Sequence, residues 1–370
     1  MKKLVTHLIV GLGKGGAETM LYQVLKYRTD SELTHRVISL GASHYYEQPI
    51  RELGVELIEL PLKKNPVSAL LRLPGLVKGS DTLCCWMYHA NLLGYVAGKL
   101  AGVKKIVWCI RHSNLDPKLN SAMTLRINRI CARWSAKVSA VVYNGNRARE
   151  VHEQMGYCRS IGHVVDNGCD CEEYAPNPSA GESLRKELGI AEDQKIVLSL
   201  TKDTPIKDVP TFLKAFSALK QTRMDTVAVL CGPGMVDTNE NITGLCGKLG
   251  LVPGRDIYLL GLRHDVPRLL AGCDLFVLHS AGEAFPNTLL QAMACGCLCV
   301  TTDVGDARLI LAQDDCVVPP GEAAVLSDKM REIFELTHAQ MEQMRVDNRK
   351  SAQERFEVSQ IIRNYEELFL

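Results

Sequence analysis

The sequence predicts an α/β fold in which two doubly wound domains, each a parallel sheet covered by helices, follow one another. Short apolar runs typical of buried strands alternate with amphipathic segments typical of helices along the whole chain. A polar stretch containing proline and glycine interrupts this alternation between residues 174 and 189. A length of 370 residues with 46% hydrophobic residues is enough for two separate cores.

The expected elements follow in chain order. In the first half we expect strands at residues 4–10, 34–40, 81–87, 104–110 and 140–145, with helices at 18–26, 90–100 and 121–137. In the second half we expect strands at residues 195–200, 226–232, 256–261, 274–280 and 297–303. Ligands of such sheets lie beyond the carboxyl ends of the strands, so we expect a cleft walled by strand-to-helix loops of both domains.

The polar stretch sets the expected domain boundaries. Pro176, Pro178 and Gly181 lie in it, and a new helix begins after them. We therefore expect an N-terminal domain at residues 1–178 and a second domain at 190–354. Apolar residues at helical spacing predict a further helix at 355–370 that docks on one of the domains.

Composition argues against several classes of protein. A net charge of +1 gives no bulk attraction to nucleic acid, and no apolar run reaches the roughly 18 residues of a membrane-spanning helix. The fourteen cysteines are scattered without a C-x-x-C pair, which argues against a zinc site or a disulfide framework. We expect them to be small core residues in a reducing compartment, with Cys295, Cys297 and Cys299 on one face of a buried strand.

The first strand-to-helix loop is rich in glycine. Gly11, Gly13, Gly15 and Gly16 separate an apolar strand from a helix, where the backbone can approach a ligand and helix N–H groups can attract an anion. The spacing satisfies the G-x-G-x-x-G pattern of dinucleotide sites, but the second strand ends without the acid that would hold a ribose. A flexible turn without a ligand is the alternative interpretation.

Two further loops carry charge. Lys202 lies at a strand end and Lys207 near the following helix start, so the loop suits a diphosphate, although two solvated lysines are the alternative. In GEAFPNTLLQAMACG, residues 282–296, Asn287 is the expected N-cap of a short helix that ends at a glycine. Glu283 then lies near the helix N-terminus, and Gln291 can point toward the same crevice. Alternatively, Glu283 only favours the helix dipole and Gln291 is an ordinary helix former.

Several motifs together indicate a family. They are GGAE at residues 15–18, DNGCD at 166–170, TKDTPIKD at 201–208, CGPG at 231–234, and the run from GLRHDV through VTTDVGD at 261–306. Over nearly the whole chain this set resembles the family 4 retaining glycosyltransferases, glycosyl transferases group 1. The resemblance implies a GT-B fold, in which two Rossmann-like domains face each other across a deep cleft and the helix at 355–370 packs back on the N-terminal domain.

The resemblance also implies a donor site. Gly15 and Gly16 would lie over the diphosphate of a nucleotide sugar, and Lys207 matches the phosphate-binding lysine of the family. Lys202 stands where the family usually has arginine. Glu283 would hold hydroxyls of the donor sugar, and Gln291 stands where a glutamate binds the ribose. The remaining expected donor contacts are Gly232, Leu262, Arg263, Ala284, Phe285, Pro286, Asn287 and Thr288.

Retaining transfer needs a stabilised leaving diphosphate while the sugar is attacked from the same face. The resemblance implies Glu283, His112 and Lys207 as catalytic residues, with His112 near the donor sugar and the attacking acceptor. His89, Arg111 and Asn114 would lie on the acceptor side. We expect no cofactor and no metal requirement, because no D-x-D motif ends a strand.

A row of cations on one expected helix indicates a possible binding partner. Arg126, Arg129, Arg133 and Lys137 share one stripe of an expected helix without a nearby acid, which suits anionic lipid head groups, although a solvated helix face is the alternative.

The sequence as a whole predicts a hexosyltransferase that moves a hexose or N-acetylhexosamine from a nucleotide diphosphate, with UDP preferred. The expected acceptor is a glycan or lipid-linked oligosaccharide of cell-surface polysaccharide biosynthesis, such as lipopolysaccharide or capsule. The expected location is the cytoplasm, with the cytoplasmic face of the inner membrane as a peripheral site. The alternatives are a catalytically weak nucleotide-sugar-binding protein, prompted by Gln291, Ala284 and Lys202, and a GT-B nucleotide-sugar epimerase.

Overall fold

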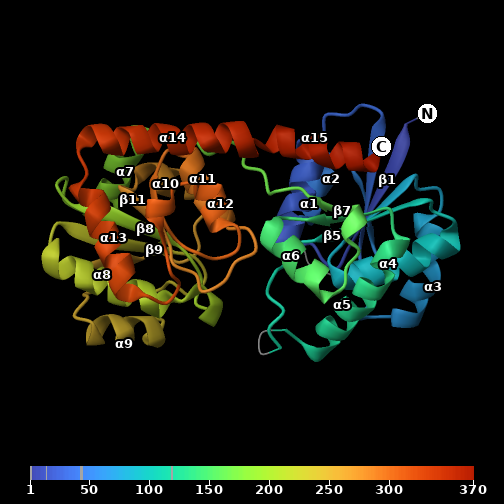
Figure 1. Ribbon diagram of the computed structural model, residues 1–370, viewed down its shortest axis with the longest axis horizontal. Coiled ribbons are helices and arrows are strands. Elements are labelled where there is room, and N and C mark those ends of the chain that lie inside the picture. The colour runs from blue at the N-terminus through green and yellow to red at the C-terminus, as the bar shows by residue number, and fades with distance from the viewer. Residues whose placement is uncertain (1, 14, 42–44, 118–119) are drawn as a thin grey trace. The chain divides into compact units, whose positions relative to one another are not determined.

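The structure is a computed structural model that describes residues 2–13, 15–41, 45–117 and 120–370 (Figure 1). The chain divides into two compact units. Unit 1 comprises the chain up to Gly168 together with Val358–Leu370, and unit 2 comprises Cys169–Glu357. Each unit has a parallel sheet with helices on both faces, which confirms the predicted α/β fold class.

The sheet of unit 1 has seven strands in the order β3-β2-β1-β4-β5-β6-β7. Chain order reverses at β1, which pairs with β2 on one side and with β4 on the other. The carboxyl ends of β1 and β4 flank this switch point, where doubly wound sheets bind ligands. The strands are β1 (Lys3–Ile9), β2 (Leu33–Ser39), β3 (Glu56–Glu59), β4 (Thr82–Trp86), β5 (Lys105–Ile110), β6 (Ala140–Tyr143) and β7 (Gly162–Val164).

Two hydrophobic clusters lie on opposite faces of this sheet. One packs beneath α1 (Gly16–Lys26), α2 (Glu47–Glu52) and α15 (Val358–Phe369). The other packs beneath α3 (Pro66–Val77), α4 (Tyr88–Ala101), α5 (Ala122–Trp134) and α6 (Asn146–Met155). The strands are buried on both sides, which explains why their sequences are apolar throughout and do not alternate.

Helix α15 completes unit 1, although unit 2 precedes it in the chain. The hydroxyl of Tyr365 accepts a hydrogen bond of 2.6 Å from Arg111 Nη1. Thr82 Oγ1 donates to the carbonyl of Phe369 over 2.8 Å. The Glu366 carboxylate accepts from the backbone N–H of Thr29. These bonds fix the helix on the face of the sheet that α1 also covers.

The observed boundaries differ from those expected at residues 178, 190 and 354. The polar stretch after Gly168 already belongs to unit 2, because Arg349 donates to the carbonyls of Tyr174 and Cys171 over 2.6 and 2.7 Å. Helix α14 (His338–Phe356) continues to residue 356, and the chain returns to unit 1 after Glu357.

The sheet of unit 2 has the order β10-β9-β8-β11-β12-β13. Here the switch point lies at β8, between β9 and β11. The strands are β8 (Lys195–Leu200), β9 (Thr226–Cys231), β10 (Ile257–Leu259), β11 (Leu275–Leu278), β12 (Leu298–Thr302) and β13 (Val317–Val318). The helices besides α14 are α7 (Ala180–Leu188), α8 (Val209–Thr222), α9 (Glu240–Lys248), α10 (Val266–Gly272), α11 (Asn287–Ala294), α12 (Ala307–Leu311) and α13 (Ala323–Glu335).

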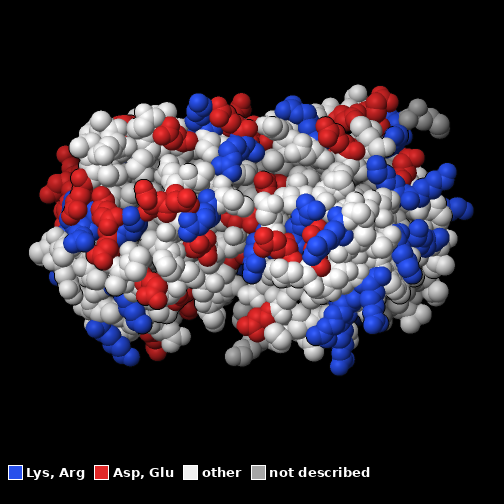
Figure 2. All heavy atoms as spheres, viewed as in Figure 1, with Lys and Arg blue, Asp and Glu red and all other residues white. Residues whose placement is uncertain are grey.

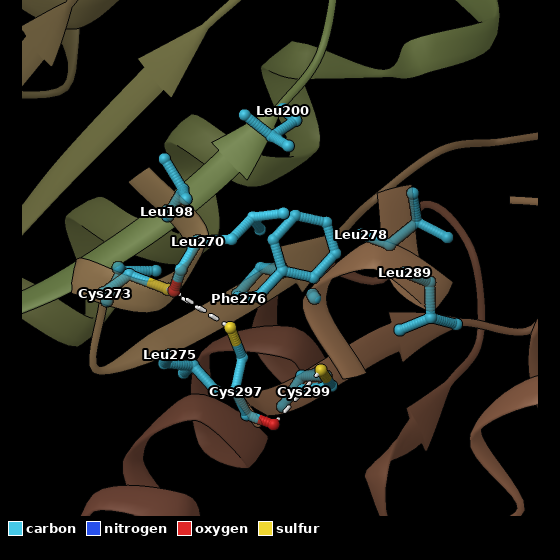
Figure 3. Packing of buried hydrophobic residues seen from close by; sticks show 14 of the residues in the cluster. Leu198, Leu200, Leu270, Cys273, Leu275, Phe276, Leu278, Leu289, Cys297 and Cys299 are labelled. Carbon is cyan, nitrogen blue, oxygen red and sulfur yellow. Dashed lines mark hydrogen bonds between the residues drawn. The ribbon is translucent and has the colours of Figure 1, made fainter. Parts of the chain in front are cut away.

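The cysteines are core residues, as predicted. All are free thiols, and all except the half-buried Cys158 are buried. Around Phe276, the thiol of Cys297 donates to the carbonyl of Leu270 over 3.0 Å (Figure 3). The prediction that one strand face carries Cys295, Cys297 and Cys299 is wrong, because Cys295 closes α11 and Cys297 precedes β12. Burial raises the pKa of Cys299 well above its usual value, so this thiol stays protonated.

Candidate functional site

Two loops of unit 2 meet through oppositely charged side chains. Lys207 ends a 3₁₀ turn (Pro205–Lys207) between β8 and α8, and Glu283 lies between β11 and α11. Lys207 Nζ donates to Glu283 Oε1, and the hydroxyl of Ser280 donates to the same oxygen over 2.8 Å. Because β8 and β11 are neighbours in the sheet, both loops leave its carboxyl edge side by side.

The backbone joins the same two loops. The N–H of Ala281 donates to the carbonyl of Ile206 over 2.8 Å. Farther along, Thr302 Oγ1 donates to the carbonyl of Ser280 over 2.7 Å. Bonds among the turn after β8, the loop after β11 and the end of β12 therefore support the charged pair.

Helix α11 places the residues that follow Glu283. The predicted N-cap Asn287 is instead the first helical residue, and Pro286 occupies the cap position without a side-chain capping bond. Gly296, with φ +72°, ends the helix as predicted. Thr288 and Gln291 are half-buried in the first turns of the helix. Without a side-chain cap, the first N–H groups of α11 depend on other partners, which can include an anion.

Phe285 and Ala284 contact other parts of unit 2. The side chain of Phe285 is only 6% exposed, and its ring lies 5.9 Å from that of Phe356. The side chain therefore belongs to the core of unit 2, and a donor contact by Phe285 stays a prediction for its backbone. The carbonyl of Ala284 accepts a hydrogen bond from the backbone N–H of Asp306 over 3.2 Å. It also lies so close to Gly305 that a Cβ on Gly305 would clash with it.

The neighbouring loops of unit 2 differ in what they offer a ligand. Gly232 has φ +139°, and a Cβ there would overlap the carbonyl of Thr201, so only glycine fits. Leu262 is 54% exposed. Arg263 forms ion pairs with Glu187 and Asp265 over 2.7 and 2.8 Å, and these bonds lower the pKa of Asp265 strongly. The guanidinium of Arg263 is thus held by acids of unit 2, and a contact of Arg263 with the donor stays a prediction.

Lys202 differs from Lys207 in its surroundings. It is exposed beside β8, whereas Lys207 is half-buried and paired with Glu283. Solvent therefore screens the charge of Lys202 more strongly.

In unit 1, the glycine loop already holds an acid. Gly15 is the N-cap residue of α1 and Gly16 its first helical residue. The carboxylate of Glu18 folds back over Gly15, where a Cβ would collide with it, whereas the space around Gly16 is open. Burial raises the pKa of Glu18. An anion approaching Gly15 would therefore meet the Glu18 carboxylate, whereas Gly16 stays accessible.

The loop after β5 carries the expected acceptor-side residues. His112 Nε2 lies 3.2 Å from Asn120 Oδ1, and Asn114 Oδ1 accepts from the N–H of Asp116 over 2.8 Å. His89, in the first turn of α4, is half-buried, and burial lowers its pKa. Arg111 is only 9% exposed, and its Nη1 bonds to Tyr365, while Nε and Nη2 are buried without a hydrogen-bond partner. Its assignment to the acceptor side stays a prediction.

The structure thus brings together Lys207 and Glu283, with Gln291 and Thr288 on the helix that follows. The contribution of Gly15, Gly16, His89, His112 and Asn114 to the same site stays a prediction. Sequence reasoning missed Ser280 and its neighbour His279, although both end the expected strand 274–280.

Comparison with known proteins identifies the family. Residues 181–355 match the family model described as "Glycosyl transferases group 1". The N,N'-diacetylbacillosaminyl-diphospho-undecaprenol alpha-1,3-N-acetylgalactosaminyltransferase of Campylobacter jejuni is 30% identical over 280 residues, 70% of this chain and 70% of that protein. The chain belongs to the glycosyl transferase group 1 family.

Similarity to other glycosyltransferases extends over more of the chain. The putative glycosyltransferase EpsF of Bacillus subtilis is 25% identical over 314 residues, 82% of this chain and 79% of EpsF. The crystal structure of Anabaena Alr3699/HepE in complex with UDP superposes with a TM-score of 0.85 at 24% identity, over 99% of both chains. The fold is therefore GT-B, as the sequence predicted.

Within the described ranges, no group of three histidine, cysteine or acidic side chains is arranged to hold a metal ion. In that same part of the chain, none of the helices combines the length and apolar character needed to cross a membrane.

Proposed function

We propose that this glycosyltransferase is a retaining hexosyltransferase, which moves a hexose or N-acetylhexosamine from a UDP-sugar to a glycan or lipid-linked oligosaccharide of cell-surface polysaccharide biosynthesis. The pairing of Lys207 with Glu283 at the carboxyl ends of β8 and β11 is the main support. Lys207 is a cation suited to a diphosphate, and Glu283 is an acid suited to sugar hydroxyls. Because the two side chains are in direct contact, one nucleotide sugar can reach both, with its diphosphate at Lys207 and its sugar at Glu283.

The chemistry divides between these two side chains. Lys207 would neutralise the charge that develops on the leaving diphosphate, together with N–H groups at the start of α11. Glu283 would accept hydrogen bonds from hydroxyls of the donor sugar and would not act as a nucleophile. His112 would lie on the acceptor side. The leaving phosphate would take the proton of the acceptor hydroxyl, so no cofactor or metal is required.

The names of relatives support the choice of donor and acceptor. The HepE structure contains UDP, and the Campylobacter jejuni relative is named for a diphospho-undecaprenol substrate. We therefore propose a UDP-sugar donor and a lipid-linked acceptor, at the cytoplasmic face of the inner membrane.

A panel of nucleotide sugars tests the function against its alternative. A transferase will release UDP from at least one UDP-sugar in the presence of a lipid-linked or glycan acceptor. A binding protein without turnover, which Gln291, Ala284 and Lys202 suggest as the alternative, will show a raised melting temperature with the same compounds but no nucleotide release. An epimerase will instead convert the sugar while it stays attached to UDP.

Replacing Gln291 with glutamate will preserve or improve affinity for UDP. An amide oxygen can accept a hydrogen bond from a ribose hydroxyl, but a carboxylate accepts a stronger one. Titration calorimetry with UDP checks the change, with Gln313→Glu as a control that alters charge elsewhere in unit 2. Complete loss of binding in the Gln291 variant would show that the pocket depends on the amide.

The acceptor proposal agrees with a basic surface on unit 1. Between residues 60 and 137 the chain has thirteen lysines and arginines but only two acids, although the net charge of the whole protein is +1. Helices α3, α4 and α5 contain no acid. Figure 2 shows lysine and arginine side chains gathered over this part of the molecule. These helices cover one face of the sheet, so their outer sides form one layer, which we call the basic layer.

The predicted stripe lies on the basic layer. Arg126, Arg129, Arg133 and Lys137 are exposed, and none forms an ion pair within the described part of the chain. Large apolar side chains are exposed among the cations of the same three helices, namely Val67, Leu70, Leu71, Val96, Leu100, Met123 and Ile130. Cations interspersed with apolar groups suit the interface of an anionic bilayer. We propose that this layer holds the enzyme at the membrane that carries its acceptor.

Charge reversal of the stripe will release the protein from anionic vesicles. The triple variant Arg126→Glu, Arg129→Glu, Arg133→Glu should lose most sedimentation with phosphatidylglycerol vesicles, since each cation contributes about 1 kcal/mol near such a surface. The control Lys186→Glu, Lys214→Glu, Lys248→Glu makes the same charge change on exposed lysines of unit 2. Equal sedimentation of both variants, or binding by the wild type that is insensitive to salt, would contradict the proposal.

A further inference from the structure

A buried histidine lies beneath the charged pair of unit 2. His279 follows β11 directly and is only 2% exposed. Its Nε2 lies 2.8 Å from the hydroxyl of Ser199 on the neighbouring strand β8, which is itself buried. The ring also packs against Phe212 of α8, with 4.9 Å between ring centroids. His279 therefore contacts both elements that flank the Lys207 turn.

The other side of the imidazole faces the turn itself. Nδ1 makes no hydrogen bond of ordinary geometry, but the backbone of Lys207 and that of Asp208 lie close enough to influence the ring. Burial lowers the pKa of His279 to about 4, so the ring is neutral near pH 7 and adds no charge beside Lys207.

The turn has a backbone that needs support. Asp208 has φ +46°, which is unusual for a residue other than glycine, and it is the N-cap of α8. Such a conformation persists only where the surroundings hold it in place. His279 is one of these surroundings, and the residues that follow it are Ser280, which bonds to Glu283, and Ala281, which bonds to Ile206.

We propose that His279 is a positioning residue of the donor site, which with Ser199 supports the Lys207 turn from below and sets the distance between Lys207 and Glu283. It touches neither donor nor acceptor in this role. This inference rests on the proposed function, because it assigns to Lys207 the diphosphate of a nucleotide sugar.

Substitution of His279 should weaken donor binding more than it reduces the amount of folded enzyme. In His279→Phe, an aromatic ring remains against Phe212 but both ring nitrogens are lost. We expect the Kd of UDP and the KM of the donor to rise about ten-fold, while the KM of the acceptor stays unchanged. His279→Gln, whose amide can still reach Ser199, should recover part of this loss. A purely structural role would lower kcat with both KM values unchanged.

Two further variants complete the design. His35 is a matched control in unit 1, since it is buried, has a pKa of about 4, bonds through one nitrogen to His7 and leaves the other without a partner. His35→Phe should lower the melting temperature without changing the Kd of UDP. Should His279→Phe fail to fold, Ser199→Ala removes the same bond from the other side and should also raise the Kd of UDP.

The outcomes separate the two claims. Wild-type Kd and donor KM in His279→Phe or Ser199→Ala, or an equal rise in His35→Phe, would overturn the role of His279 while leaving the proposed function intact. A wild-type protein that binds neither UDP nor any other nucleoside diphosphate would overturn both.

Discussion

Replacing Glu283 with alanine will abolish detectable sugar transfer, which means a fall in kcat of about 100-fold or more. The affinity for UDP will stay at its wild-type value or rise. Transfer fails because the sugar loses the acid that orients its hydroxyls. UDP affinity survives because the substitution frees Lys207, which is bound to Glu283 in the structure, to meet the diphosphate. The two measurements therefore move in opposite directions, which general unfolding cannot produce.

The matched control for this variant is Glu332→Ala. Glu332 also forms an ion pair with a lysine of unit 2, Lys329, but on the outer side of α13. It should leave both transfer and UDP binding unchanged. A Glu283→Ala enzyme that transfers sugar at the wild-type rate would remove Glu283 from the mechanism, and one that loses UDP affinity would show that the acid supports the turn and does not compete for Lys207.

Replacing Lys207 with alanine will weaken donor binding by about 2 kcal/mol or more, which is roughly 30-fold in Kd. The lysine side chain is only 20% exposed, so its charge is screened less than that of an exposed lysine. Its removal also leaves the carboxylate of Glu283 without its cation, next to the expected position of an anionic ligand. Both effects oppose diphosphate binding, and titration calorimetry with UDP measures their sum.

Two other lysines serve as comparisons for this variant. Lys214→Ala, on the exposed side of α8, should have no effect. Lys202→Ala should have a smaller effect than Lys207→Ala, because Lys202 is exposed. If Lys207→Ala leaves the Kd of UDP unchanged, the diphosphate does not bind at this turn. The double variant with Glu283→Ala should recover only part of the affinity that Lys207→Ala loses, since the unpaired carboxylate is gone but no lysine remains to meet the diphosphate.

The sequence predicted most strands because burial on both faces makes them continuous apolar runs. The strands β3, β7 and β13 were not predicted, since none of them contains more than two consecutive apolar residues. Gly296 was predicted as a helix end because that position needs a positive φ. Asn287 was misplaced by one position, which lies within the usual uncertainty of a helix start.

The sequence predicted several residues of the site but not the contacts between them. Strand ends placed Lys207 and Glu283 at one edge of the sheet, but nothing local in the chain shows that they pair across 76 positions. The same holds for Arg111, which follows a predicted strand, because nothing local in the chain indicates its bond to Tyr365 across 254 positions. Long-range partners decide whether such a side chain meets a ligand or stabilises the fold.

The position of α15 has a consequence for biosynthesis. Domains generally fold in the order in which the ribosome produces them. Here the helix that stacks on Trp86 and bonds to Arg111 is translated only after all of unit 2. The nascent N-terminal unit therefore keeps part of its apolar face uncovered until the last residues of the chain have been made.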